Sequence, residues 1–332
     1  MKYRDSTFDI MKGIAMVLVI LSHTAPLINH NHPFAYWRSA MFFIISGYFA
    51  KEWPFLEFMQ KGAKRLIIPY IVTCLFMLPF VLLGEQILEV NVLPNVLKSM
   101  FWGAASFGYD GKWKEITIGP LWFVCASIWV RIMWSFFRKI SNEYIRGCVI
   151  LLLAMASYRL KAFIPNPWSI FSAFGALGFF YAGFMIRNKN LLNSNTGKKI
   201  FPITMICLVY CISFSELDIN YCIYAKGLYV VELIASMGAF ILLYTIVQRF
   251  SDITMYPWKF LNFFGRYSLV AFCVHSVDHC LNVHWFPFRL WDLFASDFEI
   301  VLALIMRVGF VAIGVYLVSK NKFLRERVFF IK

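Results

Sequence analysis

Two ionisable side chains lie in an apolar run near the amino terminus, eleven residues apart: Lys12 and His23. A helix turns by about 100° per residue, so this spacing brings the second side chain to within about 20° of the first. The rise of about 1.5 Å per residue separates the two groups by about 16 Å, near half of a bilayer core. Because ionisable groups at membrane depth are costly and commonly functional, the run predicts a site.

The two ends of this stripe suit different steps of a transfer reaction. Imidazole titrates near neutral pH, so His23 is suited to take the proton from an attacking hydroxyl as a general base. A covalent intermediate on His23 is the less favoured version. Asp9 lies one turn before Lys12, and we expect it to pair with that cation. In the alternative interpretation, Lys12 snorkels to the membrane interface and His23 ends an ordinary span.

Three later stretches combine aromatic, small and polar residues: MFFIISGYF at 41–49, GPLWF at 119–123 and GRYS at 265–268. Together with the first run they resemble the membrane-bound acyltransferase 3 family, above all its shorter, fucose 4-O-acetylase-like members. That family transfers acyl groups from acyl-CoA to hydroxyls of sugars and other acceptors. Its first helix typically has an Arg, ten residues and then an essential His. This chain keeps the spacing, with Lys12 in place of the Arg.

The resemblance implies which residues meet the donor. The phosphates of acetyl-CoA would stay at the cytoplasmic mouth, while the pantetheine arm carries the thioester toward His23, the expected catalytic base. Because Lys12 is a point charge without a planar fork, bidentate binding of a phosphate is lost at this position. The residues expected to contact the donor are Lys12, Ser46, Lys61, Lys64 and Arg65. For the basic residues at 61–65, membrane topology alone is the alternative explanation.

A second group of residues is predicted to bind the acceptor or to support the site: Asp9, Trp122 and His275. The family tends to have a His after the Gly-x-x-Ser pattern, which favours His275. Asp278 and His279 share its helical face, but two His without a third donor are a weak signal, and we expect no metal. Trp122 can stack on a sugar, line the donor path or simply pack. Three further ionisable residues in predicted spans are expected to pair across the bundle: Arg131, Glu232 and Arg307.

The composition excludes a soluble domain, because 60% of the 332 residues are hydrophobic and only 15% are charged. We predict an all-α polytopic membrane protein with about ten transmembrane helices in one bundle, forming a single domain over residues 1–332. Basic residues gather in alternate loops, so the net charge of +14 indicates topology rather than nucleic-acid binding. Both termini are then cytoplasmic, in the cytoplasmic (inner) membrane. The predicted spans lie near 8–28, 34–50, 66–84, 119–137, 145–160, 168–187, 200–216, 227–247, 263–284 and 299–319.

These features predict a membrane O-acyltransferase that uses acyl-CoA. Acetyl is the expected acyl group, and succinyl stays open. The short loops leave no separate acceptor-binding domain, so we expect a sugar hydroxyl of a glycan or of a lipid-linked sugar at the membrane. A homo-oligomer also stays open. The alternative is a transporter or flippase, since scattered intramembrane charges also mark substrate pathways, but no second copy of the Lys-x10-His stretch indicates an internal repeat.

Overall fold

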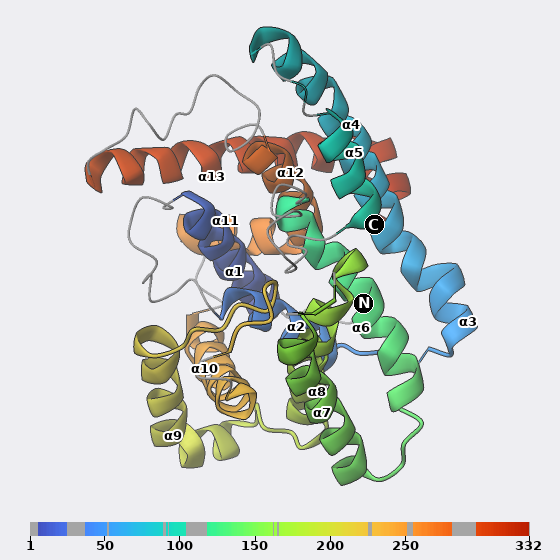
Figure 1. Ribbon diagram of the computed structural model, residues 1–332. Coiled ribbons are helices and arrows are strands. Elements are labelled where there is room, and N and C mark those ends of the chain that lie inside the picture. Colours follow the sequence, from blue (N-terminus) through green and yellow to red (C-terminus); the bar gives the residue numbers. More distant parts are fainter. Residues whose placement is uncertain are drawn as a thin grey trace.

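A computed structural model describes most of the chain. The described residues are 6–24, 37–51, 53–88, 91, 93–103, 118–161, 163–164, 166–224, 228–250, 255–280 and 297–331. Within them the regular structure is helical, apart from one isolated bridge between Asp218 and Ile223. Helix α1, Ser6–Thr24, lies in the middle of the helical bundle and contacts α2, α10, α11, α12 and α13 (Figure 1). The Lys12–His23 stripe is therefore at the centre of the fold.

The other helices follow the apolar runs of the sequence. The longer ones are α2 Arg38–Tyr48, α4 Lys64–Leu88, α6 Trp122–Phe137, α7 Glu143–Leu160, α8 Ile170–Asn188, α9 Ser194–Ser213, α10 Tyr229–Phe250, α11 Tyr256–Arg266, α12 Ser268–Cys280 and α13 Asp297–Lys320. The shorter ones are α3 Phe55–Glu57, α5 Leu93–Trp102, π-helical turns at Phe58–Ala63 and Leu324–Val328, and 3-10 turns at Gly119–Leu121 and Pro167–Ser169. The predicted span at 263–284 is thus not one helix, because α11 and α12 meet at Tyr267.

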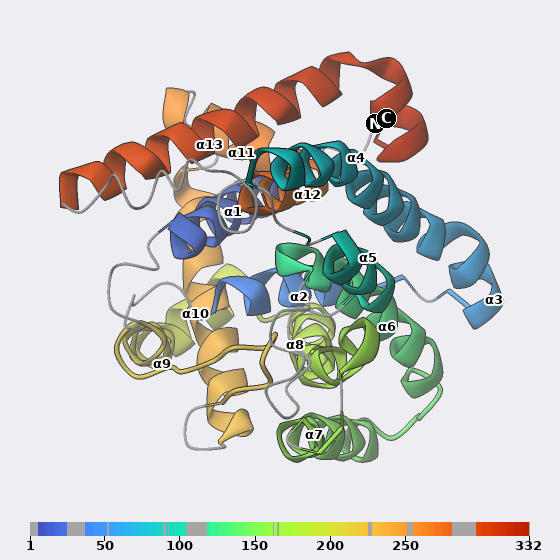
Figure 2. The same cartoon turned by 45° about the horizontal axis from the view of Figure 1, so that its top comes forward.

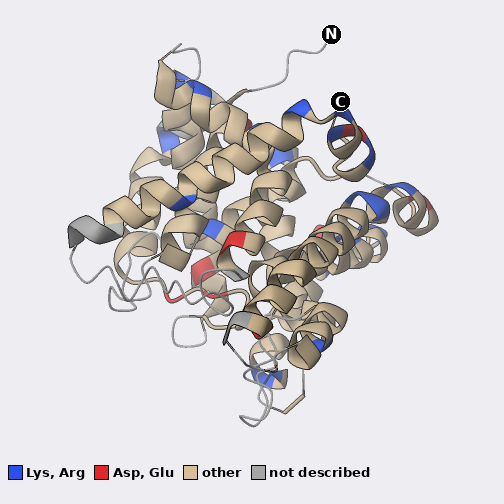
Figure 3. Ribbon diagram, turned by 90° about the horizontal axis from the view of Figure 1, so that it is seen from above, with Lys and Arg blue, Asp and Glu red and all other residues tan. Residues whose placement is uncertain are grey.

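Six helices in the described part are long and apolar enough to cross a membrane: Ser6–Thr24, Phe55–Gln86, Gly119–Phe137, Pro167–Asn188, Tyr229–Phe250 and Val301–Lys320. They bear out a polytopic membrane protein, while the larger number of about ten crossings stays a prediction. The span that contains α8 is the most enclosed of them, with 78% of its apolar stretch buried, whereas the span within α13 is only 22% buried. Figure 2 shows α13 along one side of the bundle, and Figure 3 shows few charged residues along the helices.

Glycines let two helix pairs approach closely. A side chain at Gly47 of α2 would collide with the backbone of Phe180 in α8, and one at Gly183 of α8 would collide with the backbone of Ile44. The crossing of α1 and α11 is equally close, because a side chain at Gly13 or Gly265 would collide with the backbone of the other helix. Small residues at such crossings allow dispersion contacts between backbones where lipid offers no hydrophobic driving force. These crossings fix α2 and α11 against their partners and so position the residues beside α1.

Candidate functional site

One cavity lies beside the carboxyl-terminal end of α1. It has a volume of about 310 Å³, and we call it the His23 cavity. Its lining residues in the described part come from α1, α2, α6, α12 and the segment between α9 and α10: Val19, His23, Arg38, Ser39, Gly119, Pro120, Trp122, Asp218, Asn220, Tyr221, Phe272 and His279. Pro120 fits the turn before α6 because its missing N–H needs no partner there, and this turn places Trp122 on the cavity wall.

A second cavity lies beside the amino-terminal half of α1. Its volume is about 300 Å³, and we call it the Lys12 cavity. The described residues that line it are Lys12, Ile45, Ser46, Phe49, Ala50, Lys51, Trp53, Phe58, Arg65, Arg131, Trp134, Ser135 and Phe180. Four of these are cations, and no described lining residue is acidic. The cavity therefore has the charge of an anion-binding site.

The same three helices contribute to both cavities. Helix α1 presents Lys12 to one and His23 to the other, and α6 presents Arg131 to one and Trp122 to the other. Helix α2 likewise extends from Arg38 and Ser39 to Ser46. The two cavities thus lie at different levels along one set of helices, and the helical rise predicts about 16 Å between Lys12 and His23.

Aromatic rings fill the level between the cavities. The ring centroids of Phe43 and Phe123 are 4.7 Å apart, and those of Phe123 and Phe272 are 5.1 Å apart. Phe42 also contacts Phe123, at 5.7 Å. These residues come from α2, α6 and α12, and we call them the aromatic partition. The aromatic partition therefore lies on the helices that connect the two cavities.

Three histidines gather beside the His23 cavity. The ring of His23 lies 4.6 Å from that of His279 and 5.3 Å from that of His275, measured between centroids. His279 lines the cavity, whereas His275 has no exposed surface and lies behind it. The described residues contain no group of three or more His, Cys, Asp or Glu that could hold a metal ion. The cluster is suited to proton transfer by imidazole.

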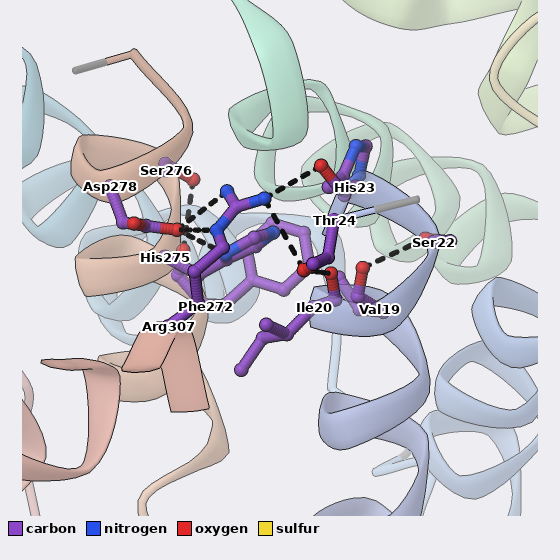
Figure 4. Close-up of polar contacts among 10 residues, drawn as sticks. All are labelled: Val19, Ile20, Ser22, His23, Thr24, Phe272, His275, Ser276, Asp278 and Arg307. Carbon is purple, nitrogen blue, oxygen red and sulfur yellow. Dashed lines mark hydrogen bonds and ion pairs between the residues drawn. The ribbon is translucent and has the colours of Figure 1, made fainter. Parts of the chain in front are cut away.

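A buried arginine joins the end of α1 to α12 (Figure 4). Arg307 of α13 donates from Nη1 to the His23 carbonyl oxygen at 2.6 Å and from Nε to Oδ2 of Asp278 at 2.7 Å. Its Nη2 lies 2.6 Å from the same carboxylate oxygen, and Nδ1 of His275 lies 3.3 Å from it. The last carbonyls of a helix lack partners within the helix, so a cation there is favourable. We call this arrangement the Arg307 clamp.

Several predicted site residues lie where the sequence analysis places them. Lys12 pairs with Asp9 at 2.6 Å, as expected, and both Ser46 and Arg65 join Lys12 at its cavity. Trp122 lines the His23 cavity.

Other predicted residues do not reach the site. Lys61 is exposed and pairs with Glu57 at 3.2 Å, and Lys64 is exposed and outside the Lys12 cavity lining. Their part in donor binding is therefore unsupported by the geometry, and membrane topology explains them better. Glu232, for which pairing across the bundle is expected, accepts from the Ser215 hydroxyl at 2.7 Å and from a backbone N–H. Arg307 does pair across the bundle, with Asp278.

The sequence analysis missed the residues between α9 and α10. Asp218 Oδ1 accepts from the backbone N–H groups of Asn220 and Tyr221, at 3.0 and 3.3 Å, which forms a tight turn against the His23 cavity. Burial raises the pKa of Asp218. The buried Asn220 Oδ1 has no hydrogen-bond partner among the described residues. An Asp-x-Asn turn is so common in loops that its spacing alone carries no functional signal.

The comparisons with known proteins agree with the motifs. A family profile described as an acyltransferase domain matches residues 5–319. The chain is also similar to the nodulation protein NolL of Sinorhizobium fredii (strain NBRC 101917 / NGR234), with 24% identity. That alignment covers 57% of this chain and 54% of the relative, so the similarity spans about half of each protein.

Proposed function

Because the chain belongs to the acyltransferase 3 family, as its motifs indicate, we propose that this membrane acyltransferase moves an acetyl group from acetyl-CoA to a sugar hydroxyl. The acceptor is a glycan or a lipid-linked sugar at the cell membrane. Both cavities are used, one for each substrate. The observation that carries the proposal is that Lys12 and His23 lie on one helix but line different cavities.

The Lys12 cavity suits the charged part of the donor. Coenzyme A carries phosphates that cannot enter lipid, and the four cations of this cavity provide their counter-charge. The pantetheine arm extends along α1 past the aromatic partition and brings the thioester to the level of His23. With the amino terminus in the cytoplasm, the donor enters from the side where acyl-CoA is made available.

His23 acts as the general base. Its imidazole takes the proton from the acceptor hydroxyl while that oxygen attacks the thioester carbonyl, and the coenzyme A thiolate leaves and takes up a proton. The Arg307 clamp holds the backbone of His23, and the rings of His275 and His279 limit its movement on one side. Transfer is direct, with no covalent intermediate on the protein.

The His23 cavity suits a sugar. Trp122 and Tyr221 offer aromatic surface, and Asn220 adds an uncharged polar side chain to the lining. Asp218 and Arg38 add polar groups of both signs. Such a mixed lining matches a ring with many hydroxyls better than it matches a long acyl chain.

The direct test uses the purified protein in nanodiscs. It is incubated with acetyl-CoA labelled in the acetyl group and with membrane glycolipids, and the label is located by mass spectrometry. Label on sugar hydroxyls is the expected result. If acetyl-CoA is consumed only by hydrolysis and a glycolipid crosses the bilayer instead, the protein is a flippase and the proposal fails.

The proposed orientation has both termini in the cytoplasm and about ten crossings. Helix α7 is the sharpest test, because it is not among the six apolar spans. Tyr144 is 86% exposed at one of its ends, and Phe163 is 72% exposed just beyond the other. In a Cys148→Ser background, Tyr144→Cys should react with an impermeant maleimide only from the cytoplasmic side and Phe163→Cys only from outside. Reaction of both from one side would show that α7 does not cross.

A further inference from the structure

Arg131 of α6 is the residue of the Lys12 cavity whose charge is least compensated. Among the described residues, neither Arg131 nor Arg65 makes a hydrogen bond or an ion pair, and both line this cavity. Arg131 lies within an apolar span, where an uncompensated cation is costly. An unpaired guanidinium group of Arg131 at a cavity therefore indicates an anionic ligand, and Arg65, which is exposed, adds a second guanidinium group to the lining.

Lys12 is less available for such a ligand than its position suggests. Its ammonium lies 2.6 Å from the carboxylate of Asp9, which is 3% exposed, so most of its charge is balanced within α1. Lys51 packs over the ring of Trp53, with 4.8 Å between its Nζ and the ring centroid. The guanidinium groups of Arg65 and Arg131 are left to bind the ligand.

Trp134 adds aromatic surface to the same lining. It lies three residues after Arg131 and is 3% exposed. Ser46 and Ser135 supply hydroxyls to the same lining.

The geometry points to Arg131 as the phosphate-binding arginine of this protein, the planar guanidinium that position 12 lacks. Its ligand is a phosphate or diphosphate group of a soluble nucleotide. Guanidinium pairs with two phosphate oxygens at once, which an ammonium does not do, so Arg131 provides the bidentate recognition lost through Lys12. Under the proposed function, on which this assignment of the ligand rests, the nucleotide is the coenzyme A part of the donor.

The test measures binding and not transfer. Wild type, Arg131→Gln and Arg131→Lys are placed in phosphatidylcholine nanodiscs, and the affinities for coenzyme A and for inorganic pyrophosphate are measured by calorimetry. Arg159→Gln is the matched control, because Arg159 is exposed on α7 and lines neither cavity. Loss of a charge-assisted pair should weaken binding of both probes by about ten-fold or more in Arg131→Gln. Arg131→Lys should recover part of the loss, and the control should match wild type.

Two outcomes would overturn the assignment. Binding of coenzyme A by Arg131→Gln within two-fold of wild type would leave Arg131 with a structural role only. The second concerns lipid: if phosphatidylglycerol in the nanodiscs displaces pyrophosphate from wild type but not from Arg131→Lys, the site holds a lipid headgroup. Thermal unfolding of each variant separates lost binding from lost fold. If pyrophosphate binding depends on Arg131, the phosphate site is supported even if no acyl transfer is found. If acyl transfer is found but Arg131→Gln does not change binding, the phosphate site is refuted and the proposed function is not.

Discussion

Removal of Arg307 should affect stability and catalysis in ways that can be separated. Arg307 and Asp278 are each 4% exposed, so Arg307→Met leaves a buried carboxylate without its cation. Breaking a buried pair by removal of one partner costs about 3–5 kcal/mol. The variant also loses the 2.6 Å bond to the His23 carbonyl, worth about 1.5–3 kcal/mol as a charge-assisted hydrogen bond. We expect an unfolding free energy several kcal/mol below that of wild type.

The double variant Arg307→Met with Asp278→Asn separates the two roles. Asp278→Asn removes the buried charge that Arg307→Met leaves without its cation, so much of the lost stability should return. The carbonyl of His23 still lacks its donor, so turnover should stay low while the Michaelis constant for the donor is little changed. Stability is measured by denaturant unfolding in detergent, and turnover is measured by transfer of label from acetyl-CoA. Arg159→Met is the control. If the double variant recovers turnover together with stability, the clamp does not position His23.

Three further predictions follow from the site. His23→Ala and His23→Gln should both lower turnover by about 10²- to 10⁴-fold while coenzyme A still binds, as measured by labelled acetyl transfer and by calorimetry. If either variant keeps turnover within a few-fold of wild type, His23 is not the base. Phe123→Leu should raise the ratio of butyryl to acetyl transfer, because a smaller side chain widens the aromatic partition, and an unchanged ratio would place the acyl path elsewhere. Because burial raises the pKa of Asp218, its ionisation destabilises the folded state as pH rises above the ordinary value of about 3.9. Asp218→Asn keeps the Oδ1 acceptor of the turn, so it should raise the unfolding free energy at pH 7 and have no effect below about pH 4, and a loss of stability at pH 7 would refute this explanation.

Local spacing predicted the parts of the site that lie on one helix. Lys12 and His23 are found on one side of α1, each at its own cavity, because a regular helix turns by a fixed angle per residue. The Asp9–Lys12 pair follows from the same geometry. The apolar runs likewise became helices, although the run at 263–284 breaks at Tyr267, two residues after Gly265.

Contacts between distant helices were not predictable in this way. The bond from Arg307 to His23 joins residues far apart in the chain, and nothing in either segment specifies the other. The same holds for Arg131, which seemed a candidate for pairing across the bundle but faces a cavity shared with cations from three other segments. A single sequence gives the period of each helix and not its rotation against its neighbours, and that rotation decides which charges meet.

The position of the three histidines changes which one should be tested after His23. The family pattern favours His275, since it follows the Gly-x-x-Ser stretch. His275 has no exposed surface, however, and its Nδ1 faces Asp278, so it has no path to a hydroxyl in the cavity. His279 lines the cavity and its ring is the nearer one to His23, at 4.6 Å. If a His23 variant retains transfer, His279→Gln should abolish the remainder, whereas His275→Gln should act mainly on stability through Asp278.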